Sequence, residues 1–514
     1  MSKTIIIIGA GLAGLSAALQ AAENGCNVKL VSPLPSERAQ SVMAEGGINA
    51  ALNTKDENDS PEEHFTDTIK AACGLADPNA VWGMTQAAPE LVHWLLKLGV
   101  KFNMSGYDDV DLRNFGGQKK KRTAFAQSDT GKQIMTAMID AVRRKEASGM
   151  VERFSHHSFL TLRLCGNICC GCVIRDEYSQ ETVELPGDAV IVATGGMHGL
   201  FGNTTGSLSN TGEVTAELFR LGVPLANGEM IQYHPTTVKC GGKRMLISEA
   251  ARGEGGRLFA MKDGKQWYFM EEKYPELGNL MPRDITAREI WKVSHESEVF
   301  LDMTEISEEI ISNKLSGLAD DCMTYLHKDI RKEPVSVLPG IHYFMGGILV
   351  DEQHRTPIQN LYAAGECCAQ YHGANRLGGN SLLGALYGGR VAAKSACEQA
   401  DVVDLSCATQ IDFPPASQIS EIKQLNKVMQ ETMGVVRNEN TLLNGIQTVQ
   451  ALTGNLPLLG MAVLKSALAR KESRGAHWRE DYPKSNDDDY LKTTVARFDG
   501  KQIQISFVPV PERR

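Results

Sequence analysis

The sequence predicts an α/β fold in which parallel strands alternate with helices, and three segments carry this prediction. The apolar segment Thr4–Ile8 leads through the glycine-containing residues 9–14 into a helix rich in Ala and Leu. A second apolar strand is expected over residues 28–32, which would complete a βαβ unit. Residues 188–196 (DAVIVATGG) have the continuous apolar character of a buried strand, and we expect this strand to join the same sheet.

The glycines at residues 9–14 (GAGLAG) have the spacing of a dinucleotide-binding turn. Gly9 permits the tight turn, Gly11 lets a pyrophosphate approach the backbone, and Gly14 lets the helix pack closely on its strand. The unpaired N–H groups and the dipole at the helix N-terminus favour bound phosphates. A glycine-rich turn without a ligand is the alternative, which the flanking strand and helix disfavour. The predicted contacts are Gly9, Ala10, Gly11, Leu12, Ala13 and Gly14.

Length, charge and hydropathy argue against several classes of protein. A chain of 514 residues can form about two to four structural units. Its net charge of −9 argues against nucleic acid as a partner, because neutralising phosphates requires a basic face. No apolar run approaches the roughly 20 residues of a membrane span. Met1 lies so close to the glycine turn that we expect no signal peptide.

The twelve cysteines do not follow the pattern of a secreted disulfide framework and fit a reducing cytoplasm better. Four of them, Cys165, Cys169, Cys170 and Cys172, lie close together, which suggests zinc or an iron–sulfur cluster as one hypothesis. They fall, however, among alternating strand residues around a Gly-Asn turn, with no second paired motif nearby. We therefore predict buried or half-buried thiols and no metal site.

The residues that follow the second strand favour a dinucleotide other than NAD. An NAD site usually has an acidic residue there, whereas this chain has Ser32 followed by Pro33. Residues 36–51 (SERAQSVMAEGGINAA) then form a loop with two adjacent glycines and few bulky side chains. Such a loop can lie against a flat ring and offer it backbone N–H groups. A plain surface connection is the alternative.

Changes in composition divide the chain into a first domain, an insertion and a C-terminal domain. Residues 60–104 are expected to be helical, and residues 150–188 are strand-like. Mixed helices and short strands mark the insertion as α+β, and amphipathic helices with a polar tail follow a Pro-Pro pair at 414–415. The predicted C-terminal helices are Ile419–Thr432, 438–452 and 458–471. The predicted segments are 1–240 and 340–410 for the interrupted first domain, 241–339 for the insertion, and 411–514 for the C-terminal domain.

A series of short motifs in a fixed order extends along nearly the whole chain. They are GAGLAG (9–14), AEGGINAA (44–51), FGGQ (115–118), ATGG (193–196), QYHPT (232–236), SEAARGEGG (248–256), PRD (282–284), HYFMGG (342–347), AAGE (363–366), HGANRLGGNSL (372–382) and KESRGAHWREDYP (471–483). With them the chain resembles the flavoprotein subunits of succinate dehydrogenase and fumarate reductase, whose relatives include L-aspartate oxidase. The resemblance implies a Rossmann-like FAD-binding domain interrupted by an α+β capping domain, with a dicarboxylate between cap and flavin, and a C-terminal helical domain.

The resemblance also implies which residues hold the flavin. Carried over motif by motif, they are Ser32, Arg38, Gln40, Ser41, Ala44, Glu45, Gly46, Gly47, Glu213, Glu366, Arg376, Asn380, Ser381 and Leu382. Glu213 stands where the family commonly has Asp, which gives a longer carboxylate for the same polar role.

The predicted substrate site follows from the chemistry of reducing a fumarate-like double bond. The reaction needs a hydride on one carbon, a proton on its neighbour, and donors for two carboxylates. His234, His342 and Arg376 match the family's substrate-binding positions, and the planar fork of Arg suits a carboxylate. A core histidine or a surface arginine is the structural alternative for each. Phe115 and Ser248 match positions that line the substrate.

The resemblance assigns the acid to an arginine. Arg283 matches the family's proton donor, and His234 is included with it among the catalytic residues. A guanidinium is a weak acid, but a developing carbanion is a very strong base, which reduces the mismatch. Glu249 and Arg252 match the family's proton relay, and their three-residue spacing places them on one face of a helix. A purely structural Glu–Arg ion pair is the alternative.

One departure from the family bears on how the cofactor is held. Many members have a Ser-His-Thr triplet whose His is bonded covalently to the flavin, whereas this chain has Ala39-Gln40-Ser41. Glutamine has no nucleophilic nitrogen, so we predict non-covalent FAD. In the family the covalent link raises the flavin potential and supports succinate oxidation. Its absence implies that electrons flow more readily toward fumarate.

Fumarate reductase, or succinate dehydrogenase, is therefore the predicted activity, and three alternatives stay open. L-aspartate oxidase also lacks the histidine, although residues 115–125 and 472–483 resemble the fumarate reductase branch more closely. A reductase of another α,β-unsaturated acid and a non-catalytic flavin-binding electron carrier are the other two. The family further implies an iron–sulfur subunit as electron source, with a possible membrane anchor. The chain itself would then be cytoplasmic and peripheral.

Overall fold

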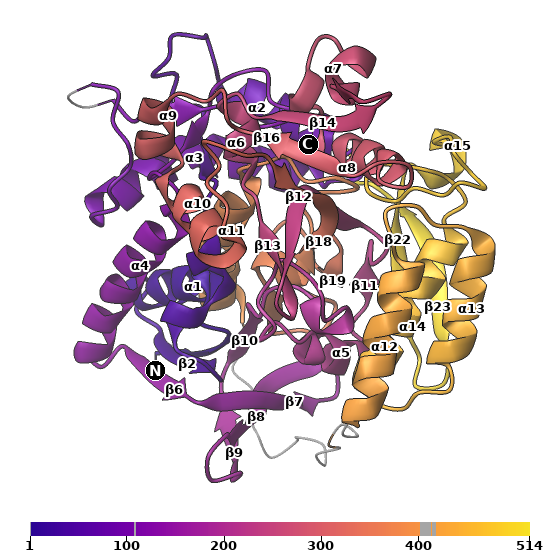
Figure 1. The fold of residues 1–514 in the computed structure, drawn as a ribbon. Helices are drawn as coiled ribbons and strands as arrows, with labels where there is room; N and C mark the ends of the chain where they lie inside the picture. Colours follow the sequence, from indigo (N-terminus) through magenta and orange to yellow (C-terminus); the bar gives the residue numbers. More distant parts are fainter. Residues whose placement is uncertain (1, 107–108, 401–412, 414–417) are drawn as a thin grey trace.

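The computed structural model describes residues 2–106, 109–400, 413 and 418–514. At the centre of the N-terminal part lies a parallel sheet in the order β20–β10–β1–β2–β6 (Figure 1). Its strands are β1 (Thr4–Ile8), β2 (Asn27–Ser32), β6 (Val151–Ser155), β10 (Ala189–Val192) and β20 (Leu361–Ala363). The three strands expected from the sequence are all present in this sheet, and the predicted α/β fold class is confirmed.

Helices cover one face of this sheet. They are α1 (Leu12–Glu23), α3 (Pro78–Lys97), α4 (Thr130–Ala147) and α11 (Asn380–Gln399), with α2 (Pro61–Ala71) packed on α3. Ile5 and Ile7 of β1 join their hydrophobic cluster. The helices α1 and α11 approach closely, since a Cβ atom at Gly389 would lie 2.3 Å from the Ala13 carbonyl oxygen.

The other face of the parallel sheet packs on an antiparallel sheet. Its strands are β7 (His157–Cys165), β8 (Ile168–Asp176) and β9 (Thr182–Pro186). Ile6 and Ile8, which alternate with the helix-facing isoleucines of β1, lie in the hydrophobic cluster between these sheets. Buried free thiols are found at Cys169, Cys170 and Cys172, as predicted. The prediction is wrong for Cys165, which is disulfide-bonded and so is not a free thiol. Within the described part of the chain, no group of His, Cys, Asp or Glu side chains has the geometry of a metal site.

Two further sheets lie in the predicted insertion (241–339) and at its borders. The sheet β13–β12–β18 is made of β12 (Ile231–Cys240), β13 (Lys243–Leu246) and β18 (Leu338–Phe344). The sheet β15–β14–β16–β17 is made of β14 (Arg257–Lys262), β15 (Lys265–Trp267), β16 (Val299–Asp302) and β17 (Val335–Ser336). The helices in this part of the chain are α6 (Glu249–Gly253), α7 (Phe269–Lys273), α8 (Arg283–Val293), α9 (Glu308–Lys314) and α10 (Ser316–Asp321). The strands β12, β13 and β18 pair across the expected borders of the insertion, so this sheet is shared by the two sides of each border. The borders themselves stay a prediction.

The C-terminal helices lie together at one side of the molecule (Figure 1). They are α12 (Ile419–Thr432), α13 (Glu439–Val449) and α14 (Asn455–Ala469), close to the predicted ranges. The expected boundary at 410/411 and the Pro-Pro pair lie outside the described residues. No helix in the described part of the chain is long and apolar enough to span a membrane.

The segment expected only as a polar tail contains regular structure. After α15 (Asp487–Tyr490), the strands β22 (Lys492–Phe498) and β23 (Ile503–Pro509) form a hairpin. The hairpin extends a sheet in the order β21–β19–β11–β22–β23. The other strands of this sheet are β11 (Leu225–Ala226), β19 (Gly347–Leu349) and β21 (Cys368–Ala369). The tail is therefore tied to strands from the middle of the chain.

Candidate active site

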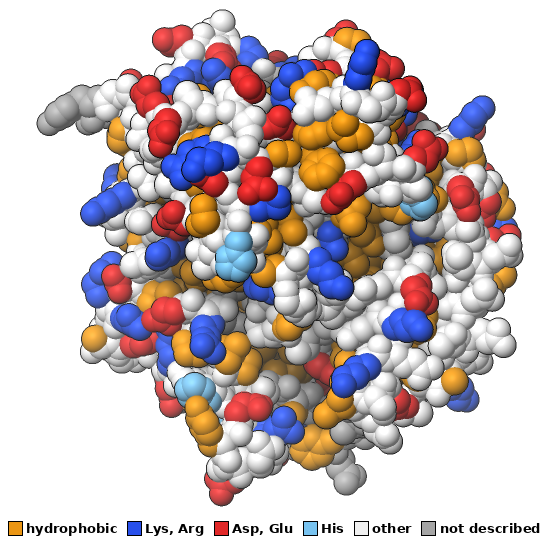
Figure 2. Space-filling model, in the orientation of Figure 1, with side chains coloured by type: hydrophobic (Ala, Val, Ile, Leu, Met, Phe, Trp, Pro, Cys, Tyr) orange, Lys and Arg blue, Asp and Glu red, His pale blue; other side chains and the backbone are white. Residues whose placement is uncertain are grey.

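Most of the residues predicted to form the site line a cavity of about 1300 Å³. Its walls come from the loop between β1 and α1, the helix α5 (Glu213–Arg220), the strands β12 and β18, the helices α6 and α8, and the start of α11. Figure 2 shows that the face over β12 and β13 is hollowed, with hydrophobic and basic side chains around the hollow. One cavity thus contains both the predicted flavin contacts and the predicted substrate residues.

The glycines of the first turn have separate physical roles. Gly9 has φ +113°, and a Cβ atom there would lie 2.3 Å from the Ala193 carbonyl oxygen. A Cβ atom at Gly14 would lie 1.8 Å from the Gly9 carbonyl oxygen, so only glycine allows α1 to begin here. Gly11, in contrast, lines the cavity, and the nearest atom to its Cβ position is Ser41 Oγ at 3.7 Å. The turn is tight on its protein side and open on its cavity side.

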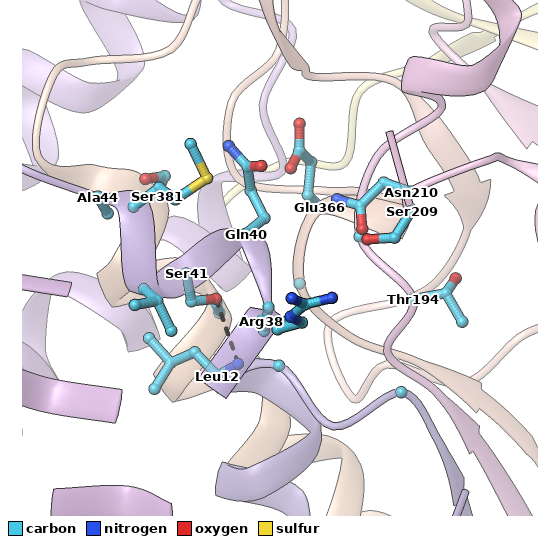
Figure 3. A pocket seen from close by; sticks show the side chains of 18 of the residues that line it. Leu12, Arg38, Gln40, Ser41, Ala44, Thr194, Ser209, Asn210, Glu366 and Ser381 are labelled. Carbon is cyan, nitrogen blue, oxygen red and sulfur yellow. Dashed lines mark hydrogen bonds between the residues drawn. The ribbon is translucent and has the colours of Figure 1, made fainter. Parts of the chain in front are cut away.

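The segment that follows β2 borders this turn. Its short helices η1 (Ser36–Arg38) and η2 (Gln40–Met43) bring Arg38, Gln40 and Ser41 to the cavity wall (Figure 3). Ser41 Oγ accepts a hydrogen bond from the Leu12 backbone N–H at 3.3 Å. The Gln40 side-chain oxygen accepts one from the Ser207 backbone N–H. Gln40 is therefore held by the protein at the position where the family's covalent histidine would stand.

The glycine pair of the predicted ring-binding loop makes close contacts. A Cβ atom at Gly46 would lie 2.9 Å from the Phe115 ring, and one at Gly47 would lie 2.5 Å from the Ala124 carbonyl oxygen. Gly47 also has φ +134°. These contacts bring the backbone of the loop, rather than side chains, to the cavity wall.

Two of the carboxyl groups in the cavity have pKa values raised to neutral pH or above. Burial raises the pKa of Glu366 to about 7, although it accepts a hydrogen bond from the Phe344 N–H at 3.1 Å. Burial and the charge of Asp321 raise the pKa of Glu45 to about 8. Glu45 Oε2 is buried and has no hydrogen-bond partner in the described structure. Both groups therefore hold a proton readily near neutral pH and can donate to a ligand.

Three predicted site residues do not line the cavity, namely Gly14, Arg252 and Asn380. Gly14 packs α1 against the turn. The Asn380 side chain is held inside the protein, where it accepts from Asn49 Nδ2 at 2.7 Å and donates to Thr68 Oγ1 at 3.0 Å. These hydrogen bonds anchor the start of α11, and the expected contact between Asn380 and the flavin stays a prediction.

Arg283, the predicted proton donor, lies in a buried ion cluster. It is the first residue of α8, and its Nε and Nη2 donate to Glu249 Oε2 at 2.9 and 2.6 Å. The other oxygen of Glu249 accepts from Arg252 Nη2 at 3.2 Å, and Arg252 lies one turn along α6 as the spacing predicted. Burial alone would raise the pKa of Glu249, but Arg283 and Arg252 outweigh it and hold that pKa below its ordinary value. Glu249 is therefore ionised and bridges the two arginines.

The histidines and the last arginine complete this end of the cavity. The rings of His234 on β12 and His342 on β18 have centroids 5.1 Å apart. Burial, followed by the charge of Arg283, lowers the pKa of both rings well below the ordinary value, so both are neutral. Arg376 lies over the Tyr343 ring at 4.2 Å, and its Nε is buried without a hydrogen-bond partner in the described structure. Burial, with the charge of Arg283, lowers the pKa of Arg376 to about 9.

Two residues of this site were not predicted from the sequence. Gln232 accepts from Arg283 Nη1 at 3.1 Å and donates to the Arg376 carbonyl oxygen at 2.8 Å, so it ties the two arginines together. Tyr343 supplies the aromatic surface under Arg376. Both lie inside motifs that were recognised, QYHPT and HYFMGG, next to the histidines that drew attention.

The residues that line the cavity fit flavin adenine dinucleotide (FAD). The helix α1 begins at Leu12, directly after its N-cap Gly11, and has no acidic residue in its first turn, so its N–H groups can meet a pyrophosphate. The same cavity is lined by Ser32, Arg38, Glu213, Gly46 and Gly47, and it includes Arg283 and Glu249 of the ion cluster. A bound FAD would therefore be held between the glycine turn and the ring-facing loop.

Comparison with known proteins identifies the family. The model described as an FAD binding domain matches residues 4–382, and the model described as the fumarate reductase flavoprotein C-terminus matches residues 452–513. The chain belongs to the succinate dehydrogenase and fumarate reductase flavoprotein family. It is thus an FAD-dependent oxidoreductase, which confirms the predicted cofactor.

The similarity extends along the whole chain. The succinate dehydrogenase flavoprotein subunit of Bacillus subtilis is 38% identical, with 100% of this chain and 98% of that protein covered. The L-aspartate oxidase of Pyrococcus furiosus is 33% identical over 94% of this chain and 97% of that protein. A solved structure of quinol fumarate reductase from E. coli has a TM-score of 0.90 at 27% identity, with 99% of this chain and 97% of that chain covered. The family's dehydrogenase, reductase and oxidase members are all represented.

We expect Gly11→Val to remove FAD without unfolding the chain. The nearest atoms to the Gly11 Cβ position are 3.7 and 3.8 Å away, so the protein can accommodate the side chain. The pyrophosphate loses its close approach, and losing about two hydrogen bonds to it would weaken FAD binding by roughly 100-fold. The FAD content of purified protein and its far-UV circular dichroism would test this. The control is Gly242→Ala, where nothing lies within 4 Å; unchanged FAD content in Gly11→Val would contradict the assignment.

Proposed function

We propose that this chain is the catalytic flavoprotein of a fumarate reductase, which reduces a C4 dicarboxylate at the buried ion cluster. The observation that carries the proposal is the charge of that cluster. Arg283, Arg252 and Arg376 supply three positive charges, while Glu249 supplies one negative charge and the two histidines are neutral. Two positive charges remain in a buried place, where an unpaired charge is costly. A dicarboxylate dianion compensates both.

Arg376, His234 and His342, together called the clamp, would hold both ends of such a substrate. Arg376, with an unpaired Nε, presents a planar donor to one carboxylate. His234 and His342 are neutral, so each can donate one hydrogen bond without adding a charge that would have to be compensated. Phe115 and Ser248 line the same cavity, and the burial of Phe115 helps to exclude water. We assign these residues to substrate binding.

The proton path is assigned to Arg283 and the two residues behind it. Bound FAD supplies the hydride. Arg283 lines the cavity and gives its proton to the neighbouring carbon as negative charge develops there. Glu249 contacts Arg283 through one oxygen and Arg252 through the other, so a proton from Arg252 can return to Arg283 through a single carboxylate. Gln232 fixes the position of Arg283 relative to Arg376, because it is hydrogen-bonded to both residues.

Gln40 supports fumarate reduction as the preferred direction. Its side chain is engaged with the Ser207 N–H and has no nucleophilic nitrogen for a bond to the flavin. A flavin held by contacts alone keeps a lower potential than a covalently attached one in this family, and reduced flavin then passes electrons to fumarate more readily. Succinate oxidation by the same site is the reverse reaction and stays part of the proposal.

Electrons are proposed to arrive from another chain. Within the described residues no cysteine group has the geometry of a metal or cluster site. The Bacillus relative is named as a subunit, and the E. coli structure is a quinol fumarate reductase. We therefore propose an iron–sulfur subunit, with a membrane anchor as the further partner, which would place this chain at the membrane surface on the cytoplasmic side.

L-aspartate oxidase is the second candidate, because the Pyrococcus relative has that name and because Gln40 is compatible with it. The C-terminal match to fumarate reductase flavoproteins favours the reductase. We expect the purified holoenzyme to oxidise a reduced viologen dye when fumarate is added, and to consume neither L-aspartate nor oxygen when the two are supplied together. Activity in the second assay without the first would establish the oxidase instead.

The remaining alternatives are separated by binding. A reductase of another unsaturated acid would oxidise the dye with that acid and not with fumarate. A non-catalytic electron carrier has no use for a dicarboxylate clamp, so fumarate, succinate and malonate would leave its flavin absorption spectrum unchanged. Because the ion cluster has excess positive charge, we expect fumarate, succinate and malonate each to bind there and to change the flavin absorption spectrum.

Arg283→Gln is expected to abolish fumarate reduction, with a loss of at least about 1000-fold in kcat, because the variant lacks the acid. FAD should stay bound, since Arg283 lies at the substrate end of the cavity. The matched control is Arg288→Gln on the same helix, which removes a contact with the Trp478 ring at 4.0 Å outside the cavity and should keep most of the activity. Substantial turnover by Arg283→Gln would contradict the assignment.

Acid precipitation is expected to release all of the flavin into the supernatant, because Gln40 offers no atom for a covalent bond. The measurement is the flavin absorbance of the supernatant against that of the washed pellet. Flavin that stays with the polypeptide after precipitation and proteolysis would show that another residue forms the bond.

A further inference from the structure

Two cysteines far apart in sequence meet at the ends of the helices that begin at the flavin cavity. Cys26 lies just before β2, after the turn that ends α1, and Cys397 lies near the end of α11. Their sulfur atoms are 3.0 Å apart, across a sequence separation of 371 residues. A disulfide bond has a length of about 2.05 Å, so a movement of about 1 Å would join them.

The environment of the two thiols differs. Cys26 is only 5% exposed, whereas Cys397 is half-buried. Cys397 also lines a small polar pocket at the surface. The other residues of this pocket are Gln20, Asn24, Arg390, Lys394 and Glu398. A small polar oxidant can therefore reach Cys397, and Cys26 lies directly behind it.

We propose that Cys26 and Cys397 form a reversible disulfide when the protein meets a peroxide, with Cys397 reacting first. The Cys397 thiolate attacks one oxygen of the peroxide, the O–O bond breaks, and a sulfenic acid and water are formed. The Cys26 thiol then attacks that sulfur, the S–O bond breaks, and a second water leaves. Two thiols are oxidised by two electrons and one hydrogen peroxide is reduced to two waters. A small dithiol restores both thiols by exchange.

This bond would connect the far ends of α1 and α11. The near ends of both helices line the flavin cavity, through Leu12 at the start of α1 and through Ser381 and Leu382 of α11. Between these ends the helices are packed closely, and Ser16 Oγ of α1 donates to the Leu386 carbonyl oxygen of α11 at 2.6 Å. The disulfide would therefore hold together the pair of helices on which the cofactor depends, whatever substrate the enzyme reduces.

The reaction is expected to be slow. Burial and the adjacent Cys26 thiol raise the pKa of Cys397 to about 12, so little thiolate is present near neutral pH. The pair therefore stays reduced at low peroxide concentrations and closes on sustained exposure.

The test uses the FAD-loaded protein, incubated with excess hydrogen peroxide and then alkylated with N-ethylmaleimide. Mass spectrometry of the unreduced digest should find one peptide pair joined through Cys26 and Cys397, which dithiothreitol separates. On a non-reducing denaturing gel the oxidised chain should migrate faster, because the bond closes a loop of 371 residues. Its Tm should rise by about 5 °C, since the bond restricts the unfolded chain.

Matched variants complete the experiment. Cys397→Ala and Cys26→Ala should each lose the joined peptide and the gain in Tm. Cys73→Ser, which changes another half-buried thiol, should keep both. If Cys26 and Cys397 are still alkylated after oxidation of the wild-type protein, or if Cys397 is found as a sulfinic acid beside a free Cys26, the proposal is wrong. Neither result depends on fumarate turnover. Failure of the disulfide proposal can therefore be told apart from failure of the proposed function.

Discussion

The bridge from Glu249 to Arg283 and Arg252 is the interaction on which the site depends. All three side chains are buried, and a buried arginine without a carboxylate partner would be strongly destabilising. One carboxylate satisfies both arginines because its two oxygens face different helices. The bridge nevertheless leaves the site with excess positive charge once Arg376 is included. The fold thus stabilises a pocket whose excess positive charge an anionic substrate would compensate.

The same bridge joins parts of the chain that are far apart in sequence. Arg283 begins α8 in the insertion, Glu249 lies on α6, and Gln232 on β12 connects Arg283 to the loop that carries Arg376. The strands β12 and β18 run from this cluster into the insertion and bring the two histidines beside each other. Movement of the insertion relative to the parallel sheet would therefore change the distance between Arg283 and Arg376. One sheet therefore sets the geometry of the proposed acid, Arg283, relative to the proposed substrate-binding residues.

The sequence predicted the parts of the structure that follow local rules. Alternating isoleucines in β1 and the glycine spacing identified the central sheet and the turn, because strand periodicity and steric exclusion act over a few residues. The hairpin β22–β23 was overlooked, although Ile503, Ile505 and Phe507 alternate with polar residues, because its partner β11 lies more than 250 residues earlier in the chain. The buried side-chain hydrogen bonds of Asn380 were overlooked for a related reason. Its motif was visible, but the side chains of Asn49 and Thr68 that hold it come from distant segments.

If FAD is bound without a covalent link, as Gln40 predicts, the contacts around the cavity alone would retain the cofactor. Gln40 is hydrogen-bonded to the Ser207 N–H, and the elements expected to retain the cofactor are the open side of Gly11, the loop at Gly46 and Gly47, and α11. Two of these three elements are ends of the closely packed pair α1 and α11, which meet where Gly389 approaches Ala13. Loosening that helix pair would separate the phosphate-binding turn from the ring-binding residues of α11. On the prediction of non-covalent FAD, the packing of these two helices would set how firmly the cofactor is held.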